Sequence, residues 1–431
     1  MSDYGVIADD LTGANATGVL LTRRGLPAAT RFAGGPAAPG IDALLWSTAS
    51  RALPPEESYR RVIAAARELK GIGVRNWAKR IDSTVRGNLG PEIDALLDFL
   101  GAGTVAVVTP AFPASGRVVA GGYLLVNGVP VSETAAARDV ATPVREAHVP
   151  MLLAAQTKHR VAHLPLATVL RGAAAISAEA QKLVTDGARI LVADATTDAH
   201  LELLVAGLEA SGITYFPADP GPFTAAVFAR RAGLTAGTTA AGAPSAASAS
   251  PAEPGARQHR PMLLVSGSVT PLTFAQLAFV REELRTVELS VPAVEPVDLA
   301  GAAREFAASI PIDTDVVIVT TADSAADVLS DLDVDALRAV AQRLGALARE
   351  LLSSRGFRGI VTTGGDVTLA VCAALGAHGI ALEREVLPLA ARGSLLGGRW
   401  EGLPIATKGG LVGDNSALYQ CCRSILEGDL A

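Results

Sequence analysis

A stretch of low complexity near the middle of the chain sets the strongest limit on how it folds. Residues 232–259 are mostly Ala, Gly, Ser, Thr and Pro, and they show no apolar periodicity. Such a segment buries too little surface to offset the conformational entropy lost on ordering, so we expect a flexible linker. The chain has 431 residues, which is more than one hydrophobic core usually serves. We therefore predict two domains, residues 1–231 and 260–431.

Short apolar runs alternate with helical patterns in both predicted domains. This alternation is typical of α/β domains with mainly parallel sheets and helices on both faces. Asn127-Gly128 is the commonest type I′ pair and predicts a hairpin over residues 123–131. The predicted strands are 6–8, 43–47, 77–80, 104–109, 189–194, 262–265, 315–320, 359–362 and 403–406. The predicted helices are 55–70, 91–100, 178–186, 199–211, 271–284, 334–353, 367–375 and 416–426.

Composition excludes several classes of partner. The net charge is −6 and the chain has no basic block, so we expect no nucleic-acid surface, which needs clustered Lys and Arg. Three cysteines without metal-like spacing are typical of a reducing compartment. No apolar run approaches the length of a membrane helix, and we predict a cytoplasmic protein that does not contact membranes. The oligomeric state is left open, with a homodimer as one option.

An acidic pair, Asp9 and Asp10, directly follows the first predicted strand. The carboxyl edge of a parallel sheet is where ligands bind in open α/β folds, and Gly13 lies in the first turn of the helix that follows. This placement indicates a catalytic role for the pair. The alternative is an Asp N-cap with a solvated neighbour.

A second charged cluster, residues 79–88, follows the strand predicted at 77–80. Alternation along an extended chain would send Arg80 and Asp82 to one side and Lys79 to the other. Arg86 carries a planar fork that can pair with a carboxylate. The alternative is a solvated polar loop. The proline-rich stretch Thr109–Arg117 is interpreted as structural when taken by itself.

Three strands of the second predicted domain end in turns of small residues that lead into helices. Glycine lets backbone N–H groups approach an anion, and the helix N-terminus adds a favourable dipole, so such turns can hold phosphates. Neither GxxxxGK[ST] nor GxGxxG occurs, which argues against a P-loop or a Rossmann site. The turns are Ser266-Gly267-Ser268, Thr363-Gly364-Gly365-Asp366 and Lys408-Gly409-Gly410.

Taken together, these motifs resemble the four-carbon acid sugar kinase family, once catalogued as a domain of unknown function. The resemblance covers nearly the whole chain outside the linker. It implies a sugar-acid-binding N-terminal domain, a nucleotide-binding C-terminal domain, and transfer of the γ-phosphate of ATP to the terminal hydroxyl of D-threonate, D-erythronate or a 3-oxo-tetronate. The matching segments are Ala8–Asn15, Lys79–Asn88, Thr109–Arg117, Asn127–Thr134, Ser266–Ser268, Thr363–Asp366 and Ala406–Asp414.

The resemblance also implies site residues. Asp9 or Asp10 is expected to accept the proton of the substrate hydroxyl, and the two are not distinguished. ATP is expected to bind with Mg²⁺, with Asp366 near the metal. The resemblance places Asp82, Ser83 and Arg86 with the acidic pair in the sugar-acid site, and Ser266, Gly364, Gly365, Asp366 and Gly410 around ATP. From their positions in the same strand-end segments, we add Lys79 and Gly13 to the expected substrate-binding residues, and Ser268 and Lys408 to the ATP-binding residues.

Two residues depart from the family pattern, one bearing on the preferred substrate and one on packing around the nucleotide. Ala16 stands where threonate and erythronate kinases usually carry an acid, and Val412 replaces a Phe. The DLTGAN motif favours a threonate or erythronate kinase over a 3-oxo-tetronate kinase. A non-catalytic sensor of a sugar acid or nucleotide is the alternative from a different class.

Overall fold

The computed structural model describes residues 2–35, 39–139, 141–234, 260–267, 270–292, 298–321, 334–410 and 412–427. The chain forms two compact units, one comprising Met1–Ala28 and Pro39–Ala240, the other Ala29–Ala38 and Ala241–Ala431. Residues 29–38 therefore group with the C-terminal unit, although they lie within the predicted first domain. Most of the predicted linker, residues 235–259, lies outside the described residues.

The N-terminal unit contains a parallel sheet with strand order β3-β1-β4-β11-β5-β10-β9. Residues of β1 and β10 are fully buried and apolar, as expected for strands covered on both faces. The register sets Ala8 beside Ser47 and Arg80, so three strands end at one level. The strands are β1 (Tyr4–Ala8), β3 (Ala43–Ser47), β4 (Asn76–Arg80), β5 (Val105–Val108), β9 (Val161–Leu164), β10 (Ile190–Ala193) and β11 (Tyr215–Asp219).

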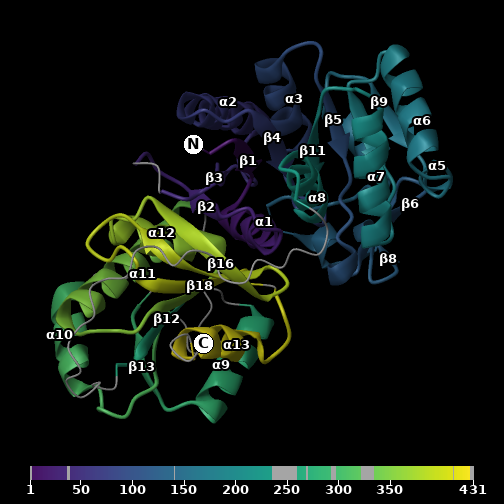
Figure 1. Cartoon of the computed structure of the whole chain (residues 1–431). Helices are drawn as coiled ribbons and strands as arrows, with labels where there is room; N and C mark the ends of the chain where they lie inside the picture. The colour runs from purple at the N-terminus through teal and green to yellow at the C-terminus, as the bar shows by residue number, and fades with distance from the viewer. Residues whose placement is uncertain are drawn as a thin grey trace. The chain divides into compact units, whose positions relative to one another are not determined.

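Two layers of helices cover this sheet, as Figure 1 shows. One layer consists of α1 (Leu11–Arg23), α6 (Ala173–Thr185), α7 (Asp198–Ala210) and α8 (Pro222–Arg231). The other consists of α2 (Pro55–Ile72) and α3 (Leu89–Leu100). Gly73 ends α2 with φ +108°, and its N–H donates to carbonyls of the last turn. The shorter helices are α4 (Val149–Ala154), α5 (Leu166–Val169), η1 (Pro113–Ser115), η2 (Val131–Glu133) and η3 (Ala135–Arg138).

A small antiparallel sheet follows β5 and consists of β6 (Arg117–Ala120), β7 (Tyr123–Val126) and β8 (Val129–Pro130). Between β7 and β8, Asn127 has φ +50° and Gly128 has φ +81°, as a type I′ turn requires. The predicted hairpin is confirmed.

The C-terminal unit contains a sheet of order β13-β14-β12-β15-β18-β17-β16-β2. The first five strands are parallel, whereas β17 runs antiparallel to both neighbours. The antiparallel pair was not predicted, because its turn at Leu389 (φ +68°) carries no glycine or asparagine signal. The strands are β2 (Ala28–Arg31), β12 (Met262–Ser266), β13 (Thr286–Ser290), β14 (Val316–Thr320), β15 (Ile360–Thr363), β16 (Gly379–Leu387), β17 (Ala390–Leu396) and β18 (Pro404–Lys408).

Helices also cover both faces of this second sheet (Figure 1). One face carries α10 (Leu299–Ser309), α11 (Val334–Ser354) and α12 (Gly365–Ala374), and the other carries α9 (Pro271–Glu283) and α13 (Ala417–Leu426). Met262, Leu264 and Ile318 on the strands pack with Leu277 of α9 and Leu418 of α13 in a buried core. Both units are α/β with mainly parallel sheets, which confirms the predicted fold class.

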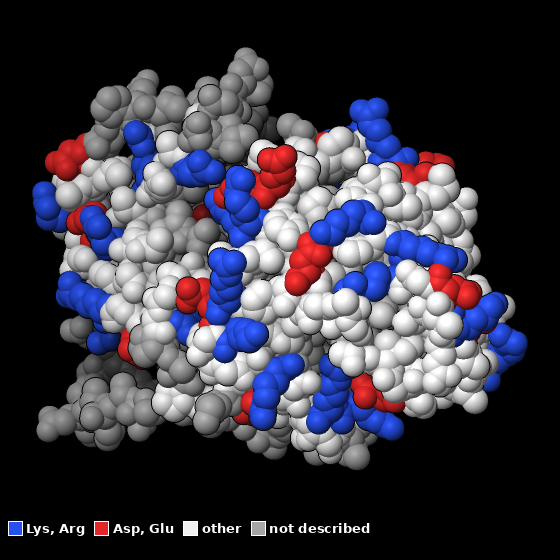
Figure 2. Space-filling view, turned by 90° about the horizontal axis from the view of Figure 1, so that it is seen from above, with Lys and Arg blue, Asp and Glu red and all other residues white. Residues whose placement is uncertain are grey.

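Charged side chains are dispersed over the face drawn in Figure 2. Basic and acidic residues are interspersed there with uncharged areas. In the described residues, no helix is both long and apolar enough to cross a membrane.

Candidate functional site

The acidic pair lies where β1 ends and α1 begins. Asp10 is the N-cap of α1, and the backbone N–H of Gly13 donates to its Oδ1 at 2.9 Å. A Cβ atom added to Gly13 would lie 1.9 Å from Cζ of Arg80, so glycine lets this guanidinium pack against the helix. The capping alternative is thus correct for Asp10, while its neighbour Asp9 is buried at 3% exposure rather than solvated.

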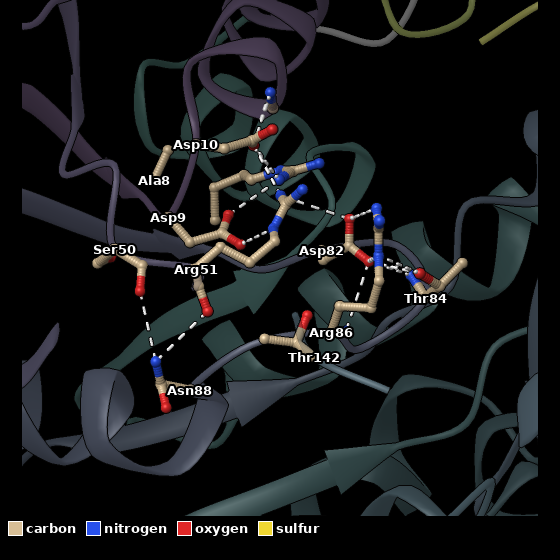
Figure 3. A network of polar contacts seen from close by, with 12 residues as sticks. Ala8, Asp9, Asp10, Ser50, Arg51, Asp82, Thr84, Arg86, Asn88 and Thr142 are labelled. Carbon is tan, nitrogen blue, oxygen red and sulfur yellow. Dashed lines mark hydrogen bonds and ion pairs between the residues drawn. The ribbon is translucent and has the colours of Figure 1, made fainter. Parts of the chain in front are cut away.

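Two guanidinium groups hold this acidic pair in place (Figure 3). Nη1 of Arg80 lies 3.0 Å from Oδ1 of Asp9 and 2.8 Å from Oδ1 of Asp10. Nε of Arg51 lies 2.6 Å from Oδ2 of Asp9, and its Nη2 lies 2.8 Å from Oδ1 of Asp10. Burial raises the pKa of Asp9, but Arg51 and Arg80 outweigh burial and lower it to about 2. Asp9 is therefore a permanent carboxylate at neutral pH.

Asp82, in the loop after β4, extends this network, and together with Asp9, Asp10 and their arginines it forms the N-terminal cluster. Arg86 forms a bidentate ion pair with Asp82, in which Nε lies 2.9 Å from Oδ2 and Nη2 lies 3.0 Å from Oδ1. Nη1 of Arg86 lies 3.0 Å from Asp139, and Nη2 of Arg51 lies 3.4 Å from Asp82. Burial opposes ionisation of Asp82, but Arg51 and Arg86 hold its pKa well below the usual range. The fork of Arg86 is thus occupied by carboxylates of the chain itself.

Lys79 lies beneath the cluster rather than in it. It is fully buried, and its Nζ lies 2.8 Å from Oε2 of Glu92 on α3 and 2.7 Å from the carbonyl of Arg80. The hydroxyl of Ser50 donates to the other oxygen of Glu92 at 2.6 Å. The ammonium group of Lys79 is thus enclosed by internal partners, and its contact with a substrate stays a prediction. Ser83 is also buried, at 5% exposure.

Sequence reasoning missed Arg51, although Arg51 touches three of the cluster's carboxylates. It enters from the loop after β3, where Ala49 adopts φ +47° and Asn88 donates from its side chain to the carbonyl of Leu53 at 2.7 Å. The signal that could have found it is its position after an apolar strand, the same criterion that selected Asp9 and Asp82. Asp139 was missed because it is distant in sequence from every strand end of the cluster.

In the C-terminal unit, the three predicted small-residue turns begin side by side, at the ends of the adjacent strands β12, β15 and β18. The register places Ser266 beside Thr363, and Thr363 beside Lys408. The buried hydroxyls of Ser266 and Thr363 have no hydrogen-bond partner among the described residues. Gly364 has φ +99° and precedes α12, whose first turn contains Gly365 and the exposed Asp366. Ser268 lies outside the described residues.

Side chains of Lys408 and of α9 fix the loop after β18 by donating hydrogen bonds to its backbone carbonyls. Nζ of Lys408 donates to the carbonyls of Gly409 (2.7 Å) and Val412 (3.2 Å). On α9, Thr273 donates to the carbonyl of Gly410 at 3.3 Å, and Gln276 donates to that of Val412 at 3.0 Å. The carbonyls of Gly410 and Val412 thus face α9, and that of Val412 also accepts from Lys408. Burial lowers the pKa of Lys408 to about 8.

The described residues contain no group of three or more His, Cys, Asp or Glu side chains arranged to hold a metal ion. The carboxylates of the N-terminal cluster are already paired with arginines.

Comparison with known proteins identifies both halves of the chain. A family model described as a sugar-binding N-terminal domain matches residues 4–227, and one described as a nucleotide-binding C-terminal domain matches residues 263–418. A Haemophilus influenzae protein, whose family was catalogued as a domain of unknown function, has a crystal structure similar to this one. The TM-score is 0.71 at 25% identity, over 97% of this chain and 98% of the other.

Two relatives are kinases by name. The chain is 42% identical over 447 residues to a D-erythronate kinase from Heliobacterium modesticaldum, which covers 99% of this chain and 98% of the relative. It is 34% identical over 437 residues to a D-threonate kinase from Bordetella bronchiseptica, with 98% and 97% covered. With similarity of this extent and both domain models matched, the chain belongs to the family of four-carbon acid sugar kinases.

Proposed function

We propose that this protein transfers the γ-phosphate of ATP to the terminal C4 hydroxyl of D-erythronate or D-threonate. The observation that carries the proposal is the 42% identity to a D-erythronate kinase over 99% of the chain. In this proposal residues 1–231 bind the sugar acid, residues 260–431 bind the nucleotide, and residues 232–259 link them. The descriptions of the two matching domain models support the same division of roles.

We assign the role of general base to Asp10 rather than Asp9. The hydrogen bonds that Asp10 receives all end on Oδ1, and its Oδ2 receives none from the described residues. Asp10 is also partly exposed, whereas Asp9 is buried and pairs through both oxygens. A base must reach the hydroxyl proton within hydrogen-bond distance, which favours the open oxygen of Asp10. Asp9 then serves to hold Arg51 and Arg80.

Asp82 and Arg86 form a fixed polar surface in the same network as Asp10, the proposed base. Their two parallel hydrogen bonds fix both side chains, so a sugar hydroxyl that contacts them meets a pre-organised surface. Ser83 and Gly13 complete the proposed substrate site. Gly13 contributes by admitting Arg80 rather than through its N–H group, which Asp10 already uses.

The nucleotide is proposed to bind at the strand ends of the C-terminal unit. The unpartnered hydroxyl of Ser266 and the N-terminus of α12 at Gly365 are suited to phosphate oxygens, and Gly364 and Gly410 complete the proposed site. Ser268 belongs to the same proposed site. Mg²⁺ bound to ATP would neutralise charge on the phosphates, and Asp366 is the residue that we propose would hold one of its waters. Lys408 contributes by shaping the loop that contains Gly410.

A coupled assay of ADP release tests the proposal directly. Purified protein is incubated with MgATP and a panel of D-erythronate, D-threonate, their L-isomers and the 3-oxo-tetronates, and ³¹P NMR locates the phosphate on the product. ADP release with D-erythronate or D-threonate and a C4 phosphate supports the proposal. Preference for a 3-oxo-tetronate would favour the alternative kinase activity. Binding of acid and nucleotide without ADP release would favour a sensor.

We also propose that the protein is cytoplasmic and forms a homodimer. Cys372, Cys421 and Cys422 are buried and free, which supports a reducing compartment such as the cytoplasm. We propose a homodimer, and light scattering coupled to size-exclusion chromatography would measure its mass.

A further inference from the structure

The arginines in and beside the N-terminal cluster differ in whether carboxylates of the protein form ion pairs with them. Arg51, Arg80 and Arg86 each form ion pairs with at least two carboxylates. Arg117 pairs through its backbone with Phe112, in the loop that leaves the carboxyl end of β5. Because β5 and β4 both pair in parallel with β11, this loop lies at the same sheet edge as Asp82. The charges of Asp82 and Arg86 accordingly act on the pKa of Arg117, Asp82 raising it and Arg86 lowering it. Among the described residues, however, Arg117 forms no ion pair. It is therefore the cation of this group that lacks a carboxylate.

The position of Arg117 is fixed by its backbone. It is the first residue of β6, and it exchanges two backbone hydrogen bonds with Phe112, one of 2.8 Å and one of 3.2 Å. Its Nη1 donates to the carbonyl of Ser115. Its Nε is enclosed by protein and has no hydrogen-bond partner among the described residues. The chain therefore holds a half-buried guanidinium in place while leaving part of its fork unused.

Such an arrangement is unfavourable for the protein alone. Burial is the main influence that lowers the pKa of Arg117, which means that its charge is incompletely solvated. A desolvated cation is stabilised strongly when an anion with matching geometry pairs with it. A carboxylate presents two oxygens in a plane and matches the guanidinium fork.

We infer that Arg117 binds the carboxylate of the sugar acid and thereby selects acids over neutral polyols. The inference rests on the proposed function, because it assigns one end of the proposed substrate. Arg86 is less suited to this role, since its fork is already occupied by Asp82 and Asp139. The carboxylates of the cluster are then left to contact the substrate hydroxyls, and Arg117 contacts the opposite end of the molecule.

The test compares D-erythronate with its neutral amide, D-erythronamide, which keeps every hydroxyl. A charge-assisted bidentate pair contributes enough that Arg117→Met should raise KM for D-erythronate by roughly 10- to 150-fold. The KM for ATP and the kcat/KM for the amide should be unchanged, so the preference for the acid disappears. Arg117→Lys keeps the charge without the fork and should give an intermediate KM. Arg75→Met removes an exposed arginine that pairs with Asp3 and serves as the control.

Two results would overturn the inference. One is an unchanged KM for D-erythronate in Arg117→Met, and the other is an equal loss for acid and amide, which indicates a structural role. If Arg117→Met does not fold, Arg117→Lys decides by the same comparison. Calorimetric binding of D-erythronate without ATP separates this inference from the proposed function. A wild-type protein that binds the acid through Arg117 but releases no ADP would retain the inference and refute the kinase activity.

Discussion

Lys79→Met is expected to destabilise the N-terminal unit strongly. Lys79 is fully buried and Glu92 is 2% exposed, with 2.8 Å between Nζ and Oε2. Removing one partner of a buried ion pair typically costs about 3–5 kcal/mol, because the other charge remains desolvated. The control is Lys182→Met, which removes a lysine that is 67% exposed and 3.8 Å from Glu179. Exposed pairs of that kind contribute about 0–1 kcal/mol.

The pH dependence gives this prediction a second, independent signature. Burial raises the pKa of Glu92, and the nearby Lys79 lowers it. Without Lys79 the folded-state pKa of Glu92 rises further above the unfolded value of about 4.3. A raised carboxyl pKa contributes stability that is present at low pH and is lost as the pH rises through the folded-state pKa. The deficit of Lys79→Met should therefore grow as the pH increases above about 4.

The double variant Lys79→Met, Glu92→Gln separates stability from substrate contact. Gln keeps an acceptor for the hydroxyl of Ser50 and removes the unpaired charge, so most of the lost stability should return. Urea unfolding followed by the fluorescence of Trp46 and Trp77, both in this unit, measures the free energies. We expect the double variant to keep a near-normal KM for the sugar acid.

Either of two results would refute the reasoning. A loss below about 1 kcal/mol in Lys79→Met would show that the pair is not desolvated as its burial indicates. A stable double variant with a KM for the acid raised more than about tenfold would show that Lys79 contacts substrate, as the sequence suggested.

Three further predictions concern the two proposed sites. Asp10→Asn keeps the helix cap but removes the base, so kcat should fall about 10²- to 10⁴-fold while calorimetry shows unchanged ATP affinity; wild-type turnover would exclude Asp10 as the base. Gly13→Ala places a Cβ 1.9 Å from the guanidinium of Arg80, so thermal melts should show a loss of about 1–3 kcal/mol, whereas Gly34→Ala, with no atom within 4 Å, should be neutral. Burial lowers the pKa of Lys408 to about 8, so unfolding free energy should rise with pH between about 8 and 10.5, where the unfolded lysine still binds its proton. Lys408→Met should lose that rise in urea titrations at each pH, and a slope equal to that of the wild type would contradict the assignment.

Much of the fold was predictable from local pattern. Predicted strand 43–47 coincides with β3, and predicted helix 334–353 differs from α11 by one residue at its end. Buried parallel strands carry continuous apolar runs, which makes them visible without any knowledge of their neighbours. Strands β2, β16 and β17 were not predicted, because a short or half-exposed strand has no such run and depends on pairing partners for its stability.

The candidate site was predictable in part. Position after a strand selected Asp9, Asp10 and Asp82, which the structure brings into one network. The same criterion selected Lys79, yet alternation along β4 turns it away from the cluster toward Glu92. Arg117 was interpreted as structural. Nothing in its local sequence shows that Arg80 and Arg86 form ion pairs with carboxylates, whereas Arg117 forms none among the described residues.

By itself the sequence determined the alternation of buried strands and helices, the α/β class and the residue types available at the ends of those strands, because periodicity and turn chemistry act over a few neighbouring residues. Only the tertiary structure decided which carboxylate each arginine neutralises, why Asp10 keeps an open oxygen, and how deeply Lys79 and Lys408 are buried. These properties depend on desolvation and on charges brought together from distant parts of the chain. That is why chemistry at this site follows from packing rather than from local pattern.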